Sequence, residues 1–298
     1  MSDDMSSAVG TSDEVDTVQR SLSTGLPTWC SYYGVACNST STSATYASVI
    51  SITLLSQHLV GTIPSSIGSL TSLQYLYLDQ NSLGGTLPSS ILSLTSLHAI
   101  YLWHNSLTGT IPSWIGSLTS LQYLVLGTNS LVGTVPSGIG LLTSLLQFSV
   151  EENRLNGTIP SSLGLLTSLQ LLYLRVNSLS GTIPSSLGSL TSLTILYLES
   201  NKLAGTIPST FSKLTRLSYL HLDNNYLTMG SATTVPNSTF SSATLSGTLA
   251  LSSNCLAFHY GSNSVSATHC APTSGKSAIL YCMEYVLSRK AAQCHIMT

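Results

Sequence analysis

Hydrophobic and polar residues follow a pattern that repeats every 24 residues through the middle of the chain. Each unit reads L-x-x-L-x-L-x-x-N-x-L-x-G-x-I-P, and the segments 73–96, 97–120 and 193–216 superimpose without gaps. Asn, Gly and Pro keep fixed places in the unit, at Asn81, Asn105, Asn129, Asn153, Asn177, Asn201 and Asn225, at Gly61, Gly85, Gly109, Gly133, Gly157, Gly181 and Gly205, and at Pro64, Pro88, Pro112, Pro136, Pro160, Pro184 and Pro208. Self-similarity at one period indicates a solenoid rather than independent globular domains.

Each unit predicts one short β-strand followed by turns. In L-x-x-L-x-L the alternating leucines, such as Leu76, point into the coil, while Tyr75 and Tyr77 point outward. Gly permits the next turn, and Pro fixes an extended segment that suits a second short strand or a polyproline-like run before a brief 3₁₀ or helical turn at 64–70. We therefore expect an α/β solenoid, a superhelix with a parallel strand sheet on its concave face, short turns on its convex side and a cap at each end.

The recurring Asn is predicted to be structural. Its side-chain amide has two donor hydrogens and one acceptor oxygen, and it lies where the chain turns inward. Backbone groups of adjacent coils buried there without a partner would each cost about 1–3 kcal/mol. We expect the Asn side chains to satisfy them.

This unit resembles the plant-type leucine-rich repeat, whose signature is G-x-I-P. The order Trp29-Cys30 followed by Gly-Val-Ala-Cys37 resembles the N-terminal cap of secreted proteins of that type, and the resemblance implies a Cys30–Cys37 disulfide. In the same way Asn-Cys255 and His-Cys270 resemble a C-terminal cap closed by a second bridge. Pairing itself cannot be read from the sequence, because six cysteines allow fifteen connectivities.

The hydroxyl-rich GTIPSSIGSLTSL spacer and the two cap motifs together resemble the leucine-rich-repeat surface antigens of kinetoplastid-type protists, over about residues 15–272. That resemblance implies a cell-surface or secreted recognition protein, of a kind commonly anchored by a C-terminal segment. We expect residues 1–12 to be disordered, 13–48 to form an N-terminal cap with a short helix at 15–26, 49–230 to form eight repeats and 231–271 to form a C-terminal cap. For the tail, 272–298, two alternatives stay open: Cys282 and Cys294 pair with each other, or the tail is an alternative terminus in place of a membrane anchor.

Composition excludes two classes of partner. Only 7% of the residues are charged, against roughly a quarter in ordinary soluble domains. With nine basic and eleven acidic residues, the chain lacks the excess of positive charge that is typical of proteins that bind nucleic acid or an anionic membrane. We also expect no transmembrane segment, because the apolar run 277–287 is too short and contains Glu284.

Two features favour a secreted or cell-surface location. The cysteines lie outside the repeats, as in proteins of oxidising compartments, and N-glycosylation sequons occur at Asn38, Asn156 and Asn237. Against this, the first ten residues are polar and acidic, so no secretory signal peptide is visible.

The outward strand positions form the candidate binding face. They gather seven of the fourteen Tyr residues and most of the scarce charges. Exposed Tyr and Trp are enriched at binding hot spots, although Tyr also favours strands and packs against its neighbours there. The predicted face for a protein or glycan ligand comprises Tyr75, Tyr77, Asp79, Tyr101, Trp103, Tyr123, Glu151, Tyr173, Arg175, Tyr197, Glu199, Tyr219, His221 and Asp223.

Catalysis is not expected, and no cofactor is predicted. Glu199 and Asp223 lie on adjacent coils at a spacing near that of a retaining glycosidase pair. An open surface should leave both carboxylates ionised, so neither would serve as a general acid. His221 lies beside these carboxylates, but one histidine with two flexible carboxylates is weak evidence for a metal site.

A second face offers another function. Thr follows the Gly of each unit and builds a ladder: Thr62, Thr86, Thr110, Thr134, Thr158, Thr182 and Thr206. A regular hydroxyl array could bind ice or a crystalline polysaccharide, although recent duplication of the unit would produce the same regularity. A third alternative is a purely structural or adhesive coat protein.

Overall fold

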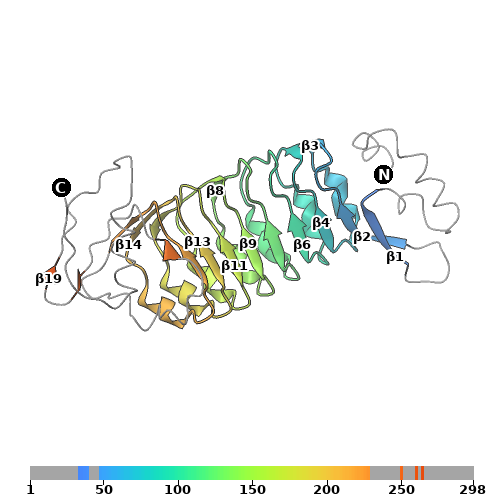
Figure 1. The fold of residues 1–298 in the computed structure, drawn as a ribbon. Coiled ribbons are helices and arrows are strands. Elements are labelled where there is room, and N and C mark those ends of the chain that lie inside the picture. Colours follow the sequence, from blue (N-terminus) through green and yellow to red (C-terminus); the bar gives the residue numbers. More distant parts are fainter. Residues whose placement is uncertain (1–32, 40–46, 229–248, 251–258, 261–262, 265–298) are drawn as a thin grey trace.

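A computed structural model describes residues 33–39, 47–228, 249–250, 259–260 and 263–264, and shows an elongated solenoid of stacked coils (Figure 1). Several expectations lie outside these residues, namely the helix at 15–26, the tail, Asn237, and all cysteines except Cys37. Cys37 lies on the first strand and packs against the core. No helix in the described part of the chain is long and apolar enough to cross a membrane.

A ten-stranded main sheet runs along one side of the solenoid. Its strands, in spatial order, are β1 (Val35–Ser39), β2 (Ala47–Thr53), β4 (Tyr75–Tyr77), β6 (Ala99–Tyr101), β7 (Tyr123–Val125), β9 (Gln147–Ser149), β11 (Leu171–Tyr173), β13 (Ile195–Tyr197), β15 (Tyr219–His221) and β17 (Leu249–Ala250). From β2 to β15 the pairing is parallel, and each residue faces the one 24 positions later, as Tyr77 faces Tyr101. Equivalent side chains of successive coils therefore stack in columns. At the N-terminal end β1 pairs antiparallel with β2 and covers the edge of the sheet.

Second strands in the described residues lie along the flank of the solenoid. They are β3 (Val60–Thr62), β5 (Ser82–Gly84), β8 (Val132–Thr134), β10 (Arg154–Asn156), β12 (Ser180–Thr182), β14 (Lys202–Gly205) and β16 (Tyr226–Leu227). They form two parallel pairs, β3-β5 and β8-β10, and one three-stranded parallel sheet, β12-β14-β16. Of these strands, β3 and β8 lie near the top of Figure 1. For the segment that Pro fixes, the sequence predicts a second strand or a polyproline-like run. The second strands end before the Pro, and Pro64 itself is extended, with φ and ψ typical of polyproline. Proline has no N–H to donate to a ladder, so pairing stops ahead of that residue. A further antiparallel pair joins β18 (His259–Tyr260) to β19 (Asn263–Ser264).

The expected turns after Pro are 3₁₀ helices, one in each of seven units: η2 (Ser65–Ser69), η3 (Ser89–Ser93), η4 (Ser113–Ser117), η5 (Ser137–Leu141), η6 (Ser161–Leu165), η7 (Ser185–Ser189) and η8 (Ser209–Lys213). Pro64 precedes η2 in an extended conformation, with φ −72° and ψ 148°. The third residue of each turn, such as Ile67, is buried. Short turns on this side and a strand sheet on the other confirm the predicted solenoid.

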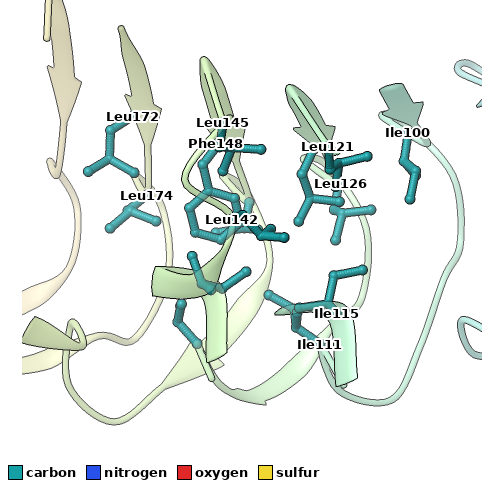
Figure 2. Packing of buried hydrophobic residues seen from close by; sticks show 14 of the residues in the cluster. Ile100, Ile111, Ile115, Leu121, Leu126, Leu142, Leu145, Phe148, Leu172 and Leu174 are labelled. Carbon is teal, nitrogen blue, oxygen red and sulfur yellow. The ribbon is translucent and has the colours of Figure 1, made fainter. Parts of the chain in front are cut away.

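Buried Leu, Ile and Val side chains fill the space between the main sheet and the 3₁₀ turns (Figure 2). Leu76, Leu172 and many equivalent residues are 0% exposed. Phe148 occupies the same place on β9 and is also fully buried. A single 24-residue coil could not cover its own apolar side chains, so each coil depends on its neighbours for burial.

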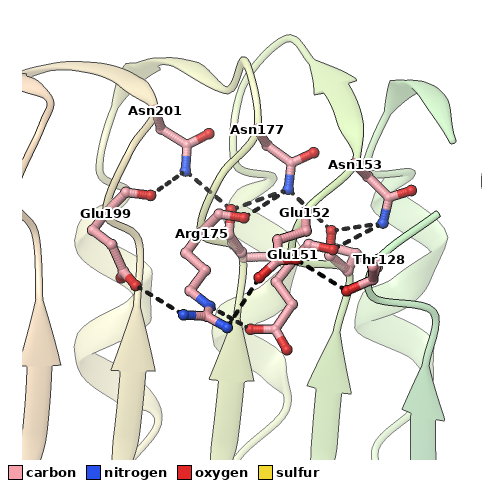
Figure 3. A network of polar contacts seen from close by, with 10 residues as sticks. Thr128, Glu151, Glu152, Asn153, Arg175, Asn177, Glu199 and Asn201 are labelled. Carbon is pink, nitrogen blue, oxygen red and sulfur yellow. Dashed lines mark hydrogen bonds and ion pairs between the residues drawn. The ribbon is translucent and has the colours of Figure 1, made fainter. Parts of the chain in front are cut away.

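The Asn ladder confirms the structural prediction for these residues. Asn201 donates from Nδ2 to the carbonyl of Leu174 in the preceding coil at 3.0 Å and to that of Leu198 in its own coil at 3.1 Å. Its Oδ1 accepts the N–H of Leu179 at 3.0 Å. Equivalent bonds recur coil after coil, so the ladder fastens each coil to the one before it (Figure 3).

Candidate ligand-binding face

The outward side of the main sheet, called here the strand face, carries three columns of side chains. The first two columns are the first and third residues of each strand, such as Tyr75 and Tyr77 of β4. The third column lies two residues beyond each strand end, as Asp79 does. All fourteen predicted binding residues fall in these columns. Other positions counted as outward are buried beside larger neighbours, namely Ala99 at 0%, Val125 at 6% and Ser149 at 1% exposure.

An N-terminal aromatic cluster covers β4, β6 and β7. The rings of Tyr77 and Tyr101 have centroids 5.1 Å apart, and those of Tyr101 and Tyr123 are 6.1 Å apart. Tyr75 stacks on Tyr77 at 6.1 Å with the rings nearly parallel. Ring packing of this kind stabilises the sheet and also pre-orders the side chains, which lowers the entropic cost of contacting a ligand.

A C-terminal aromatic cluster covers β11, β13 and β15. Tyr173 meets Tyr197 edge-on at 5.3 Å, and His221 stacks on Tyr197 at 4.4 Å. Tyr219, in the first column of the same end, is 40% exposed. The coil of β9 separates the two aromatic clusters, because its strand, Gln147–Ser149, carries no outward aromatic ring. On β7 only Tyr123 belongs to the N-terminal cluster, since Val125 stands in the second column.

Burial raises the pKa of the Tyr hydroxyls on this face. For Tyr101 it raises the pKa to about 12, helped by the neighbouring Tyr77, Tyr123 and Asp79. Burial is also the leading cause of the raised pKa values of Tyr77, Tyr173 and Tyr197. These phenols therefore stay neutral at physiological pH and present hydroxyl groups that both donate and accept hydrogen bonds.

A charged network centred on Arg175 of the third column lies beside the Asn ladder (Figure 3). Arg175 donates from Nε to Glu151 at 2.7 Å and from one terminal nitrogen to Glu152 at 3.2 Å. Its other terminal nitrogen lies 3.9 Å from Oε1 of Glu199. Thr128 donates to the second oxygen of Glu152 at 3.2 Å. Three carboxylates thus surround one guanidinium group.

The expectation that Glu199 stays fully ionised is wrong. Glu199 is only 8% exposed, and burial raises the pKa of its carboxyl to about 7. The negative charges of Asp223 and Glu151 act in the same direction, while its own backbone N–H and Arg175 act against it. Packed neighbouring columns enclose this position even though the face as a whole is open.

Asp79, another carboxylate of the third column, is bonded to the neighbouring coil. One of its oxygens accepts the backbone N–H of Trp103 at 2.7 Å. Burial raises the pKa of Asp79 to about 6, and the bond from Trp103 works against that rise. Asp79 therefore contributes to the sheet itself as well as to the strand face.

Three residues outside the predicted set also shape the strand face. His98 stacks on Tyr75 at 6.0 Å although it precedes its strand. Glu152 joins the charged network because its backbone is left-handed, with φ 53°. Gly127 leaves room for neighbouring side chains, since a Cβ there would lie 3.0 Å from the Trp103 ring and 2.9 Å from Glu151. The 24-residue register places Gly127 in the third column, but the close approach of Trp103 and Glu151 to it depends on how their side chains pack.

No group of three or more His, Cys, Asp or Glu side chains that could hold a metal ion occurs among the described residues. His221 instead packs its ring on Tyr197.

The Thr ladder lies along the flank, at the end of the second strands or just after them. Thr206 is half-buried. The other six members are exposed: Thr62, Thr86, Thr110, Thr134, Thr158 and Thr182. The methyl group of Thr62 lies only 2.8 Å from where a Cβ on Gly85 would stand, and Gly85 has φ 70°. Each coil therefore needs Gly at this place. Asn156 of the predicted sequon is exposed and pairs in register with Thr134.

Family models agree with this architecture. One for the leucine-rich repeat matches residues 95–155 and 167–227, and a second matches residues 72–94. The solenoid is built of leucine-rich repeats. No curated protein sequence matches the chain.

Solved structures similar to this leucine-rich-repeat solenoid come from plants. The ectodomain of the receptor kinase GASSHO1/SCHENGEN3 of Arabidopsis thaliana, in complex with CASPARIAN STRIP INTEGRITY FACTOR 2, is 44% identical over 57% of this chain, with TM-score 0.56. The Arabidopsis receptor kinase HAESA, in complex with the peptide hormone IDA and the co-receptor SERK1, is 33% identical over 67% of this chain, with TM-score 0.62. This chain covers only 20% and 32% of those two chains.

A plant ice-binding protein is similar over a larger share of both chains. It is 26% identical, with TM-score 0.60, and the match covers 83% of this chain and 86% of that one.

Proposed function

We propose that this leucine-rich-repeat protein is an extracellular or cell-surface recognition module that binds a protein or peptide ligand through its strand face. The observation that carries the proposal is the pair of pre-packed aromatic clusters on that face, with their neutral hydroxyl groups. The plant receptor kinase HAESA, which is similar to the chain, is solved in complex with a peptide hormone, and this supports a protein or peptide ligand over a glycan. We also propose that the protein binds its ligand without catalysing a reaction, and that it is similar to the leucine-rich-repeat surface antigens of kinetoplastid-type protists.

The first prediction concerns four Tyr residues of the strand face. Replacing Tyr77, Tyr101, Tyr173 and Tyr197 together by Ala is expected to abolish peptide binding, because truncating a hot-spot aromatic costs more than about 1 kcal/mol each. The probe is a displayed library of random 12-residue peptides, and enriched peptides are then titrated against each protein by fluorescence anisotropy.

The matched control replaces four exposed hydroxyl residues of the 3₁₀ turns by Ala, at Ser89, Ser113, Ser137 and Ser161. This control should enrich the same peptides as the wild type with unchanged affinity. Urea unfolding establishes that both variants are folded. Equal enrichment by the wild type and the four-Tyr variant would contradict the strand-face proposal.

The second prediction tests the compartment. Protein isolated from its native source is expected to carry an N-linked glycan at Asn156, because this sequon lies exposed on β10. Peptide mass mapping before and after enzymatic deglycosylation measures it. An unmodified Asn156 in an intact native preparation would count against export.

A second candidate function is ice binding by the Thr ladder, and the similarity to a plant ice-binding protein is the observation that favours it. Under this candidate, glycan-free protein shows thermal hysteresis, and replacing Thr86, Thr110 and Thr134 by Tyr removes most of it, because bulky side chains break the regular surface. The four-Tyr variant of the strand face serves as the control and should retain the hysteresis. Absence of hysteresis in the wild-type protein would exclude this candidate.

A further inference from the structure

Charged side chains of the repeats are sorted between the faces of the solenoid. Residues 47–228 contain five acidic and five basic residues, so their formal charges cancel. Every acidic one lies in the third column of the strand face or directly beside it: Asp79, Glu151, Glu152, Glu199 and Asp223. Four of the basic ones are exposed elsewhere: Arg154 on β10, Lys202 on β14, Lys213 on η8 and Arg216 after it. With Arg175 alone to offset five carboxylates, the strand face carries a formal charge of −4.

Charge alternates along the third column and then stops alternating. Glu151, Arg175 and Glu199 follow one another on successive coils, and the guanidinium group contacts both carboxylates. The next coil carries Asp223, which repeats the sign of Glu199. Two carboxylates on coils only ~5 Å apart repel each other unless a cation lies between them.

Glu199 has an unsatisfied oxygen at this break. Its residue is 8% exposed, and its Oε2 is buried without a hydrogen-bond partner in the described part of the chain. Arg175 does not supply one, because it bonds to Glu151 and Glu152 and reaches only Oε1 of Glu199, at 3.9 Å. A buried acceptor left unpaired is unfavourable, and it points to a partner that arrives from outside.

Aromatic rings flank the same break. Tyr197 lies two residues before Glu199, and His221 stacks on it at 4.4 Å. A cation beside the Tyr197 ring gains attraction from the ring as well as from the carboxylates. Burial and the charge of Asp223 raise the pKa of Glu199 to about 7, and an added cation would favour its charged form.

We propose that the C-terminal end of the strand face binds a basic peptide segment and seats a Lys or Arg side chain between Glu199 and Asp223. This inference rests on the proposed recognition function and names the chemistry of its ligand. A basic side chain there restores the alternation of charge in the third column and offsets the −4 charge of the face. It also gives Glu199 the partner that its Oε2 lacks.

The test compares three proteins against the displayed 12-residue peptide library. The first is the wild type, and the second carries E199Q and D223N, which leave the bond between Arg175 and Glu151 in place. The third carries the same two changes together with K213E. E199Q and D223N remove two negative charges, and K213E on η8 offsets them by removing one positive charge and adding one negative charge. The formal net charge of this third protein therefore equals that of the wild type, with the acid on another face.

Wild-type protein is expected to enrich peptides containing Lys and Arg above their frequency in the unselected library. Both variants should bind the enriched peptides about tenfold more weakly or worse, because each loses the charges that pair with the ligand. Binding to the wild type should also weaken as salt is raised. Urea unfolding at pH 7 is recorded for all three proteins, so that a folding defect is recognised.

Two results would overturn the inference while leaving the proposed function intact. One is enrichment of neutral or acidic peptides that depends on the four strand-face Tyr residues. The other is enrichment of basic peptides whose affinity for the variants is undiminished. This result holds if both variants bind these peptides as tightly as the wild type, or if only the variant with K213E does, because net charge and not the site would then decide binding. A wild-type protein that enriches no peptide at all contradicts the proposed function itself.

Discussion

Replacing Asn201 by Ala is expected to lower the free energy of unfolding by about 3 kcal/mol. The change leaves the N–H of Leu179 buried without its acceptor. The carbonyls of Leu174 and Leu198 lose one donor each. Asn177 still donates to Leu174, and Asn225 still donates to Leu198. The cost therefore comes mainly from the unpaired N–H and the lost volume. Urea-induced unfolding followed by circular dichroism measures it.

Asn156→Ala is the matched control for this variant. Asn156 is exposed on β10, and the same change there should alter stability by no more than about 0.5 kcal/mol. A loss at Asn201 no greater than at Asn156 would show that the ladder does not fasten the coils.

Asn201→Asp keeps the shape but removes both N–H donors, and it points a carboxylate oxygen at the carbonyls of Leu174 and Leu198. At pH 7 this variant is expected to be less stable than Asn201→Ala, because the ionised group is buried against acceptors. Its folded-state pKa is then raised above the unfolded value of about 3.9. The loss of stability is therefore complete above the raised folded pKa. It shrinks as the pH falls through that pKa towards the unfolded value. A deficit that stays constant between pH 7 and pH 4 would contradict this account.

The solenoid could be predicted because one pattern fixes many features at once. A strict 24-residue spacing sets the register of the main sheet, so that Tyr77 lies opposite Tyr101 and Glu151 is followed by Arg175 in one column. The role of Asn follows from the same spacing, since a buried amide must be paired on every coil. Position along the repeat is therefore readable from sequence alone.

Depth below the surface was less predictable, because it depends on neighbours from several coils. Ala99 and Glu199 both occupy outward positions, yet they are 0% and 8% exposed. The sequence shows which side chain stands in each column but not how deeply the neighbouring side chains bury it. The raised pKa of Glu199 results from that covering, so it could not be anticipated from an open strand face.

Phe148→Ala is expected to destabilise the protein by about 3–5 kcal/mol, the usual cost of emptying a fully buried Phe site. On β9 this side chain fills the place that Leu124 fills on β7 and Leu172 on β11. Phe148→Leu restores the common residue of the repeat and should cost only about 1 kcal/mol. Urea unfolding at one protein concentration compares the two variants with the wild type.

The position of the cavity along the solenoid should also change how the chain unfolds. Each coil is stabilised mainly by its neighbours, so a defect at Phe148 separates the coils of the N-terminal aromatic cluster from those of the C-terminal one. Two transitions, or a smaller denaturant dependence, are therefore expected for Phe148→Ala. Phe211→Ala empties a buried Phe site on η8, near the C-terminal end of the described repeats, and should fray that end while the remaining coils unfold as in the wild type. A single shifted transition of unchanged slope in both variants would mean that the repeats unfold as one unit, and that the two halves of the strand face are coupled through the whole core.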